Sequence, residues 1–186
     1  MKTIDIGEYR KRLLAILIRD AFVREKITLS SGKESDFYID ARRVTLSPEG
    51  VYLCAGIILE MIKNDGVDAV GGPTLGADPL VGAIASLSHQ VNRPINTFIV
   101  RQKPKPHGKQ QQIEGPLLKK GSRVILIDDV ATTGTSIIQA MDVLKPMEVS
   151  IVKAICIVDR REGAQEALAN RQCALLPIFS ILDFPK

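Results

Sequence analysis

The sequence lacks any long apolar run: no segment of its 186 residues approaches the roughly 20 apolar residues that a membrane-spanning helix requires. It also lacks a long basic block, because the formal net charge is only +4, and aromatic residues make up just 4% of the chain. Proteins that bind single-stranded nucleic acid combine basic grooves with stacking aromatic side chains, and this composition favours neither. We therefore expect neither a membrane protein nor a nucleic-acid-binding protein, and the slight positive charge suits phosphate binding better.

Cysteine is scarce and follows no metal-binding pattern. Cys54, Cys156 and Cys173 are odd in number, occur in apolar stretches and form no CxxC pair. We expect buried free thiols in a reducing compartment rather than disulfides or metal ligands. The N-terminal sequence MKTIDIGEYRKR has no hydrophobic signal region, so a cytoplasmic protein is expected.

The most informative segment is 124–136, which reads VILIDDVATTGTS. Its first four residues are aliphatic and largely β-branched, which predicts a strand buried on both faces. Asp128 and Asp129 follow at the carboxyl end of that strand, where ligands bind in open α/β sheets. The small residues Ala131 to Ser136 then allow backbone N–H groups, hydroxyl groups and the start of a helix near Thr135 to converge on a phosphate.

The two carboxylates of this segment suit the cis hydroxyls of a ribose. An isolated Asp-Asp pair more often caps a helix, but the pair here lies between a buried strand and a phosphate-binding turn. Competing phosphate motifs are absent, since no segment reads GxxxxGK[ST] or GxGxxG. The segment therefore predicts a site for a sugar phosphate.

Helix and strand patterns alternate along the chain, and no repeat, low-complexity tract or linker divides it. With 45% hydrophobic residues, a chain of this length predicts one domain, residues 1–186, with a sizeable core. Repeated βα units predict an α/β fold with a mainly parallel, doubly wound sheet. The predicted helices span Glu8 to Arg24, Pro48 (after an N-cap at Ser47) to Lys63, Asp78 to Gln90, Thr135 to Leu144 and Ala164 to Asn170, and the predicted strands span Val67 to Val70, Ile95 to Val100, Val124 onward, Val149 to Val158 and Leu175 to Leu182.

A polar segment at 98–115, FIVRQKPKPHGKQQQIEG, gathers several basic side chains after a strand. Its prolines and glycine disfavour a helix, and it is too long and hydrophilic for a tight connection. Composition alone favours a solvated, disordered loop. Beside a sugar-phosphate site, however, a basic loop can close over a pyrophosphate, neutralise charge and exclude water. The basic residues are Arg101, Lys103, Lys105, His107 and Lys109.

The segment VILIDDVATTGTS resembles the phosphoribosyl pyrophosphate (PRPP) signature of type I phosphoribosyltransferases. Four further segments extend the resemblance: TLSSGKESDFYIDAR at 28–42, GGPTLGADPLVG at 71–82, RxxxKxHG from Arg101, and VDRREG at 158–163. Together, and in this order, they resemble the orotate phosphoribosyltransferase family over nearly the full chain.

This resemblance implies a type I phosphoribosyltransferase fold, with a mainly parallel sheet flanked by helices and a small hood. It implies the transfer of phosphoribosyl from PRPP to orotate in the presence of Mg²⁺, giving orotidine 5′-monophosphate and pyrophosphate in pyrimidine biosynthesis. The metal would be held mainly by PRPP and water, without a direct protein ligand. The family works as a homodimer, and the basic loop of one subunit is expected to serve the site of its partner.

The resemblance also implies a role for individual residues. Lys105, His107, Asp128 and Asp129 are the catalytic candidates, with Lys105 and His107 stabilising or protonating the leaving group. For the base, Arg160 should contact a polar edge of orotate, and either Phe37 or Tyr38 should stack on the pyrimidine. PRPP would be bound by Arg101, Lys103, Lys105, His107, Asp128, Asp129, Val130, Ala131, Thr132, Thr133, Gly134, Thr135 and Ser136, and orotate by Ser31, Gly32, Lys33, Phe37, Tyr38, Thr132 and Arg160.

The chain departs from many bacterial relatives at three positions where they have lysine, namely Ser30, Gln102 and Gly76. The form PTLGADP, with glycine at 76, is typical of one branch of the family. Lys33 and Lys103 lie three and one residues from the first two positions and are candidates to compensate. These departures bear on turnover and affinity more than on the reaction.

Two other functions share the phosphate-binding segment. A phosphoribosyltransferase for another base, such as a purine, would keep VILIDDVATTGTS but lack TLSSGKESDFYID and VDRREG, both of which are present here. A PRPP-binding regulator without catalysis would normally add a DNA-binding module. The helix expected at Glu8 to Arg24 has no helix-turn-helix partner, so it is a poor candidate for one.

Overall fold

The structure is a computed structural model that describes residues 5–25, 27–28, 34–103 and 112–185. At its centre is a six-stranded sheet within these residues. All its strand pairs are parallel except the last, which is antiparallel. The order across the sheet is β10 (Leu175–Ser180), β9 (Ser150–Asp159), β8 (Arg123–Ala131), β5 (Ala69–Pro73), β6 (Asn96–Val100) and β7 (Ile113–Glu114).

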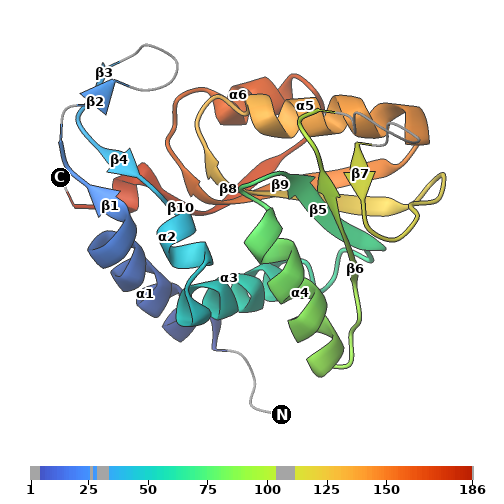
Figure 1. Cartoon of the computed structure of the whole chain (residues 1–186), viewed down its shortest axis with the longest axis horizontal. Helices are drawn as coiled ribbons and strands as arrows, with labels where there is room; N and C mark the ends of the chain where they lie inside the picture. Colours follow the sequence, from blue (N-terminus) through green and yellow to red (C-terminus); the bar gives the residue numbers. More distant parts are fainter. Residues whose placement is uncertain (1–4, 26, 29–33, 104–111, 186) are drawn as a thin grey trace.

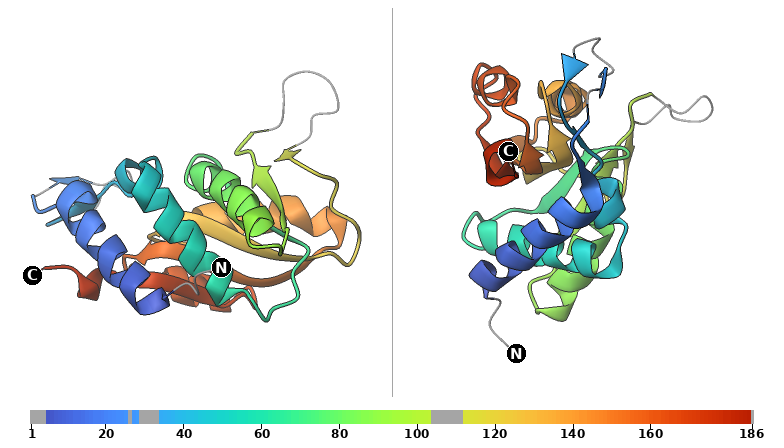
Figure 2. Two further views of the ribbon diagram at one scale, coloured as in Figure 1. Left: turned by 90° about the horizontal axis from the view of Figure 1, so that it is seen from below. Right: turned by 90° about the vertical axis from the view of Figure 1, so that its left-hand side faces the viewer.

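Helices cover both faces of this sheet, which confirms the predicted doubly wound α/β fold. Figures 1 and 2 show one group of helices against one face and a second group against the other. The first group contains α1 (Ile6–Ile16), α2 (Arg42–Thr45), α3 (Pro48–Met61) and α4 (Asp78–Gln90), and the second contains α5 (Thr135–Leu144) and α6 (Ala164–Ala169).

The central strand β8 contributes alternate residues to the two sides of the core. Ile125 and Ile127 pack in the cluster with α1, α3 and α4, whereas Val124 and Leu126 pack in the cluster with α5 and α6. All four side chains are fully buried. The run VILI is therefore buried on both faces, as predicted, and it holds the following carboxylates at a rigid strand end.

Several helix boundaries follow directly from local chemistry. Ser47 is the N-cap of α3, where its hydroxyl accepts a hydrogen bond from the Gly50 backbone N–H at 3.2 Å. Both α4 and α5 have the predicted bounds. The N-terminal helix, however, ends earlier than predicted: α1 passes into a π-helical turn at Leu17–Ala21. The chain then becomes extended at Phe22 instead of continuing the helix. This conformation lets the Phe22 ring pack against other aromatic rings.

That extended segment is part of a small hood at one end of the sheet (Figure 1). Strand β1 (Phe22–Val23) pairs antiparallel with β4 (Tyr38–Ile39), and β2 (Ile27–Thr28) pairs with β3 (Glu34–Ser35). The Phe22 ring lies 5.4 Å from that of Phe184, between ring centroids, which joins the hood to the C-terminal segment. The predicted last strand ends at Ser180 and is followed by a 3₁₀ turn at Ile181–Asp183.

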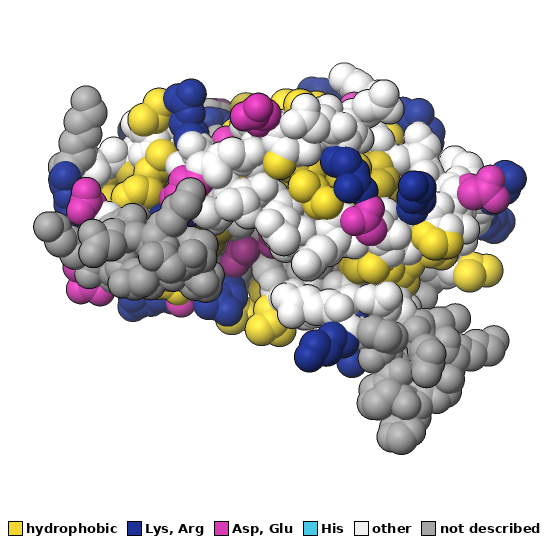
Figure 3. All heavy atoms as spheres, turned by 90° about the horizontal axis from the view of Figure 1, so that it is seen from above, with side chains coloured by type: hydrophobic (Ala, Val, Ile, Leu, Met, Phe, Trp, Pro, Cys, Tyr) yellow, Lys and Arg dark blue, Asp and Glu magenta, His cyan; other side chains and the backbone are white. Residues whose placement is uncertain are grey.

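All three cysteines are buried free thiols, as predicted, and burial raises the pKa of Cys54 to about 12. Among the described helices, none has the length and apolar character needed to span a bilayer. On the face shown in Figure 3, the described Lys and Arg side chains are dispersed among acidic and uncharged groups. This part of the surface therefore lacks the continuous basic stripe typical of nucleic-acid binding.

Candidate active site

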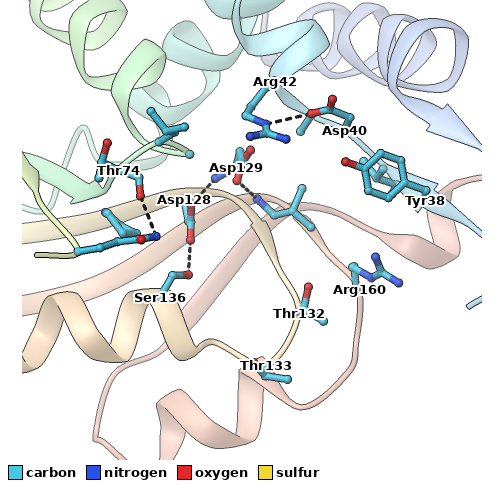
Figure 4. A pocket seen from close by; sticks show the side chains of 17 residues that line it. Tyr38, Asp40, Arg42, Thr74, Asp128, Asp129, Thr132, Thr133, Ser136 and Arg160 are labelled. Atoms are coloured by element: carbon cyan, nitrogen blue, oxygen red, sulfur yellow. Dashed lines mark hydrogen bonds and ion pairs between the residues drawn. The ribbon is translucent and has the colours of Figure 1, made fainter. Parts of the chain in front are cut away.

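A cavity of about 740 Å³ opens at the carboxyl ends of the central strands, where the sequence predicts a ligand site (Figure 4). One wall comes from the ends of β5 and β8 and the turns that follow them, and the opposite wall comes from β4 and α2. The hood thus closes a site that the sheet alone would leave open. The lining residues are Tyr38, Ile39, Asp40, Ala41, Arg42, Pro73, Thr74, Leu75, Gly76, Gln102, Asp128, Asp129, Val130, Thr132, Thr133, Ser136 and Arg160.

The two adjacent carboxylates of β8 form the floor of this cavity. Asp128 is only 5% exposed, and its Oδ2 accepts a hydrogen bond of 2.6 Å from the Ser136 hydroxyl. Its Oδ1 accepts from the backbone N–H of Asp129 at 3.0 Å, while Oδ1 of Asp129 accepts from the Val130 N–H at 2.8 Å. These bonds fix both carboxylates, so the site is organised before any ligand binds.

Burial raises the pKa of both carboxyl groups. The pKa of Asp128 rises to about 7, because burial disfavours its charge and the neighbouring Asp129 adds repulsion. The pKa of Asp129 is also raised by burial, although hydrogen bonds and the nearby Arg42 oppose the shift. A ligand that donates hydrogen bonds or brings positive charge would therefore relieve the cost of holding two negative charges side by side.

The turn at 74–76 forms the wall next to the carboxylates. The Thr74 hydroxyl donates to Oδ2 of Asp78 at 2.7 Å, which ties the turn to the start of α4. The peptide bond between Thr74 and Leu75 is cis. Gly76 packs directly against Asp128 and Asp129, leaving no room for a side chain.

The turn from Thr132 to Ser136 has the features expected of a phosphate site. Gly134 has a φ of 78°, a left-handed conformation that glycine adopts readily, and it leads into the N-terminus of α5. The hydroxyls of Thr133 and Thr135 lie 2.8 Å apart, and Thr132 accepts a hydrogen bond at its carbonyl from the Ala164 N–H at 3.2 Å. Helix α6 therefore supports the turn from behind.

Most residues predicted for PRPP binding converge on this turn, although their side chains do not all face the cavity. Val130, Thr132, Thr133 and Ser136 line it. The side chain of Ala131, by contrast, is buried in the core, so only the backbone of that residue is available.

The residues predicted for orotate divide between hood and sheet. Arg160 follows β9 and is 6% exposed; its Nε donates to Oε1 of Glu162 at 2.8 Å, and its guanidinium lies 4.6 Å from the ring centroid of Phe37. Phe37 packs beside Phe22 and supports Arg160 rather than lining the cavity. Tyr38, which is 37% exposed, does line the cavity, so it is the ring available for stacking. Ser31, Gly32 and Lys33 lie outside the described residues.

The base of the predicted basic loop is an antiparallel pair, formed by β6 and β7. Arg101 lies just beyond β6, where its N–H donates to the Gln112 carbonyl at 2.7 Å and its Nη1 is 3.4 Å from Oε1 of Glu114. Arg101 lines a second cavity, of about 290 Å³, that adjoins the first at Gln102. Lys103 is exposed, whereas Lys105 and His107 lie outside the described residues.

Sequence reasoning missed two charged residues that the structure places in the cavity wall. Asp40 and Arg42 come from the end of β4 and the start of α2, and Nε of Arg42 donates to Oδ1 of Asp40 at 3.1 Å. Both residues belong to the segment TLSSGKESDFYIDAR at 28–42. Only the fold shows that this segment faces the carboxylates of β8.

Comparison with known proteins identifies the class to which this fold and cavity belong. Residues 43–173 match the model of the phosphoribosyl transferase domain. The matched region contains the whole sheet up to β9, the 74–76 turn and both carboxylates. The chain therefore belongs to the phosphoribosyltransferase family.

Individual relatives narrow the class. The orotate phosphoribosyltransferase of Rhodopseudomonas palustris strain TIE-1 is 45% identical over 179 residues, covering 94% of this chain and 95% of that protein. A crystal structure of the Mycobacterium tuberculosis H37Rv orotate phosphoribosyltransferase matches with a TM-score of 0.82 and 35% identity, covering 94% of this chain and 98% of the other. A second crystal structure of the tuberculosis enzyme, in complex with PRPP, matches with a TM-score of 0.78 and 32% identity over the same shares. Within its family, the chain belongs with the orotate phosphoribosyltransferases, which confirms the resemblance seen in the sequence.

Proposed function

We propose that this protein transfers the phosphoribosyl group of PRPP to orotate, forming orotidine 5′-monophosphate and pyrophosphate in pyrimidine biosynthesis. The observation that carries the proposal is the convergence of a carboxylate pair, a phosphate-binding turn and a buried arginine on one cavity. Similarity to orotate phosphoribosyltransferases over nearly the full chain supports orotate as the base.

PRPP would bind with its 5′-phosphate in the turn from Thr132 to Ser136 and its ribose hydroxyls on Asp128 and Asp129. The turn offers backbone N–H groups, threonine hydroxyls and the N-terminus of α5 to the phosphate oxygens. The ribose hydroxyls would donate hydrogen bonds to the two carboxylates. Burial raises the pKa of both carboxyl groups, and such donors would stabilise their charged forms.

Orotate would bind beneath the hood. Tyr38 presents a ring to the pyrimidine, and the planar guanidinium of Arg160 suits a carboxylate or ring carbonyl group. The contacts of Arg160 with Phe37 and Glu162 hold its side chain in position, so little conformational entropy is lost when the base binds. Ser31, Gly32, Lys33 and Thr132 complete the proposed orotate site.

Catalysis would depend on positioning and electrostatics more than on a protein base. The orotate ring nitrogen is already nucleophilic, and the bond from the anomeric carbon to the diphosphate breaks as positive charge develops on the ribose ring. The carboxylates of Asp128 and Asp129, side by side in the cavity, would orient the ribose during this displacement (Figure 4). Closing the cavity under the hood keeps out water that would otherwise hydrolyse PRPP.

The leaving diphosphate would be stabilised by the basic loop. Arg101 and Lys103, at its described end, and Lys105 and His107, within it, are the proposed contacts. We propose that the protein is a cytoplasmic homodimer in which this loop completes the partner's site. The described residues on either side of this loop belong to β6 and β7 at the outer edge of the sheet, and this position is consistent with such an exchange (Figure 1).

The cavity also fits a magnesium ion bound together with PRPP. Asp128 and Asp129 provide carboxylate oxygens that can accept hydrogen bonds from the water molecules around the ion. Diphosphate and hydroxyl oxygens of PRPP would supply most of its direct contacts, because Mg²⁺ is usually bound through substrate phosphates and water. Such an ion would neutralise charge on the leaving diphosphate.

The base preference provides the test of this function. Purified protein should be incubated with PRPP and Mg²⁺ and with orotate, uracil, adenine or hypoxanthine in parallel, and the nucleotide products identified by chromatography and mass. We expect orotidine 5′-monophosphate and little product from the other bases. Preferred formation of a purine nucleotide, or PRPP binding without any nucleotide product, would overturn the proposal in favour of another transferase or a regulator.

A further inference from the structure

Positive charge is scarce among the described residues that line the main cavity. Only Arg42 and Arg160 are cationic there, facing the acidic Asp40, Asp128 and Asp129. PRPP carries most of its negative charge on the diphosphate, and binding that group requires cations near it. The diphosphate would therefore gain from a cation in the cavity wall, in addition to the contacts proposed for the basic loop.

Arg160 lies on the side of the cavity that we propose for the base. Its side chain is 5% exposed, is paired with Glu162 and lies over the Phe37 ring beneath the hood. In Figure 4 it lies beside the phosphate turn and on the same side as Tyr38. The incoming base and the leaving diphosphate lie on opposite sides of the anomeric carbon during the displacement. A residue that contacts the base is therefore poorly placed to contact the diphosphate.

The wall formed by the 74–76 turn supplies no cation either. Thr74, Leu75 and Gly76 are uncharged, as is Gln102 next to them. Gly76 packs against both carboxylates, so in this conformation its position cannot carry a longer side chain. A cation for this side of the cavity must therefore come from another element.

Arg42 has the position, the exposure and the free donors that this role requires. In Figure 4 its side chain lies next to Asp129, on the opposite side of the carboxylate pair from Thr132 and Thr133. Its side chain is 46% exposed, and only Nε is used, in the bond to Asp40. Within the described part of the chain, its two terminal nitrogens make no hydrogen bond.

Asp40 orients this guanidinium and keeps it charged. The hydrogen bond that Arg42 donates to Asp40 raises the pKa of Arg42 above its ordinary value, and the charges of Asp40 and Asp129 add to the effect. Because only Nε is used, the end-on pair of donors on the two terminal nitrogens remains available as a fork that suits two phosphate oxygens. The fully buried Val44 and Thr45 anchor the short helix α2 that carries Arg42.

We propose that Arg42 binds the diphosphate group of PRPP from the hood side of the cavity, while Asp40 acts as its positioning residue. This inference rests on the proposed function. It adds a binding residue from α2 to the diphosphate contacts proposed for the basic loop. The same wall of the cavity would then contact both the base, through the hood, and the leaving diphosphate, through Arg42.

Calorimetric binding with two related ligands tests this role without turnover. PRPP and ribose 5-phosphate share the 5′-phosphate and ribose, but only PRPP carries the diphosphate. Arg42→Gln should weaken PRPP binding about tenfold or more and change ribose 5-phosphate binding by less than about twofold. Arg42→Lys, which keeps the charge but lacks the fork, should fall between the wild type and Arg42→Gln.

Arg43 provides a matched control, because it is the neighbouring exposed arginine on α2 and does not line the cavity. Arg43→Gln should bind both ligands as the wild type does. Equal weakening of both ligands by Arg42→Gln, unchanged PRPP binding, or an effect confined to the orotate KM would each overturn the proposal. Failure of the proposed function is distinguishable, since it would be seen with the wild-type protein as absent transfer to orotate.

Discussion

A Cβ atom added to Gly76 would lie 2.2 Å from Oδ1 of Asp128 and 2.6 Å from Oδ1 of Asp129. Carbon and oxygen atoms cannot approach so closely without a shift of one of them, and Asp128 is held in place by Ser136. The glycine in PTLGADP is therefore a packing requirement of this site. A longer side chain at this position, such as that of lysine, would need a different conformation of the turn.

The first prediction follows from this contact. Gly76→Ala should lower kcat/KM for PRPP about tenfold or more, because the added methyl group displaces the carboxylates of Asp128 and Asp129, which we propose bind the ribose. Gly82→Ala is the control, since a Cβ at that position on α4 meets nothing within 4 Å. The control should keep normal activity and gain about 0.5–1 kcal/mol of stability from the improved helix propensity. Normal kinetics for Gly76→Ala would show that the turn is not in contact with the working site.

The second prediction concerns pH and stability. The pKa of Asp128 is raised from 3.8 to about 7 in the folded protein, so between these values the folded state binds a proton that the unfolded state has lost. This carboxyl group therefore destabilises the fold progressively as pH rises from about 4 to about 7, and the full cost remains at higher pH. Asp128→Asn removes that cost.

Thermal unfolding of the two proteins checks this linkage. The melting temperature of Asp128→Asn relative to the wild type should be distinctly higher at about pH 8 than at about pH 5. A difference independent of pH would contradict the raised pKa. The neutral variant is also expected to lose activity, so stability and function conflict at this residue.

The third prediction separates the two substrates. Arg160→Ala should raise the KM for orotate far more than the KM for PRPP, because we propose that its guanidinium contacts only the base. Arg161→Ala is the control, because that neighbouring side chain is exposed and does not line the cavity. Equal increases in both KM values for Arg160→Ala would mean that the residue supports the whole site.

Much of this site was predictable because its parts are local in the sequence. The strand, carboxylates and turn of VILIDDVATTGTS form one continuous unit, β8 to α5, whose buried strand and short turn leave little choice of conformation. The start of α4 was predictable because proline favours the first turn of a helix, and the start of α5 because that helix follows the short turn directly. Family resemblance then supplied the base, which local chemistry alone does not identify.

The features that sequence reasoning missed depend on contacts between distant segments. Phe22 leaves the predicted helix because its ring packs against Phe37 and Phe184, which are remote in the chain. Arg42 becomes a cavity residue only because α2 lies opposite β8. Likewise, the fold assigns Phe37 to support of Arg160 and leaves Tyr38 facing the cavity.

The fourth prediction tests shared sites in the proposed homodimer. Lys105→Ala and Asp128→Ala proteins should each be nearly inactive, but mixing and refolding them should restore activity. If the loop carrying Lys105 serves the partner, one site of a mixed dimer receives both lesions and the other receives neither. Statistical assembly puts half of the dimers in this mixed form, which predicts up to about a quarter of wild-type activity. No recovery in a verified mixed dimer would refute the exchange.

The most direct test of the central claim is the rate at which orotate absorbance falls after PRPP and Mg²⁺ are added to the purified protein. We predict rapid loss of absorbance with the wild type, and rates at least about a hundredfold lower for Asp128→Asn and for Asp129→Asn, which keep size but remove charge at the ribose. No loss of absorbance with folded wild-type protein, or near-normal rates in both variants, would contradict the assignment of phosphoribosyl transfer to this cavity.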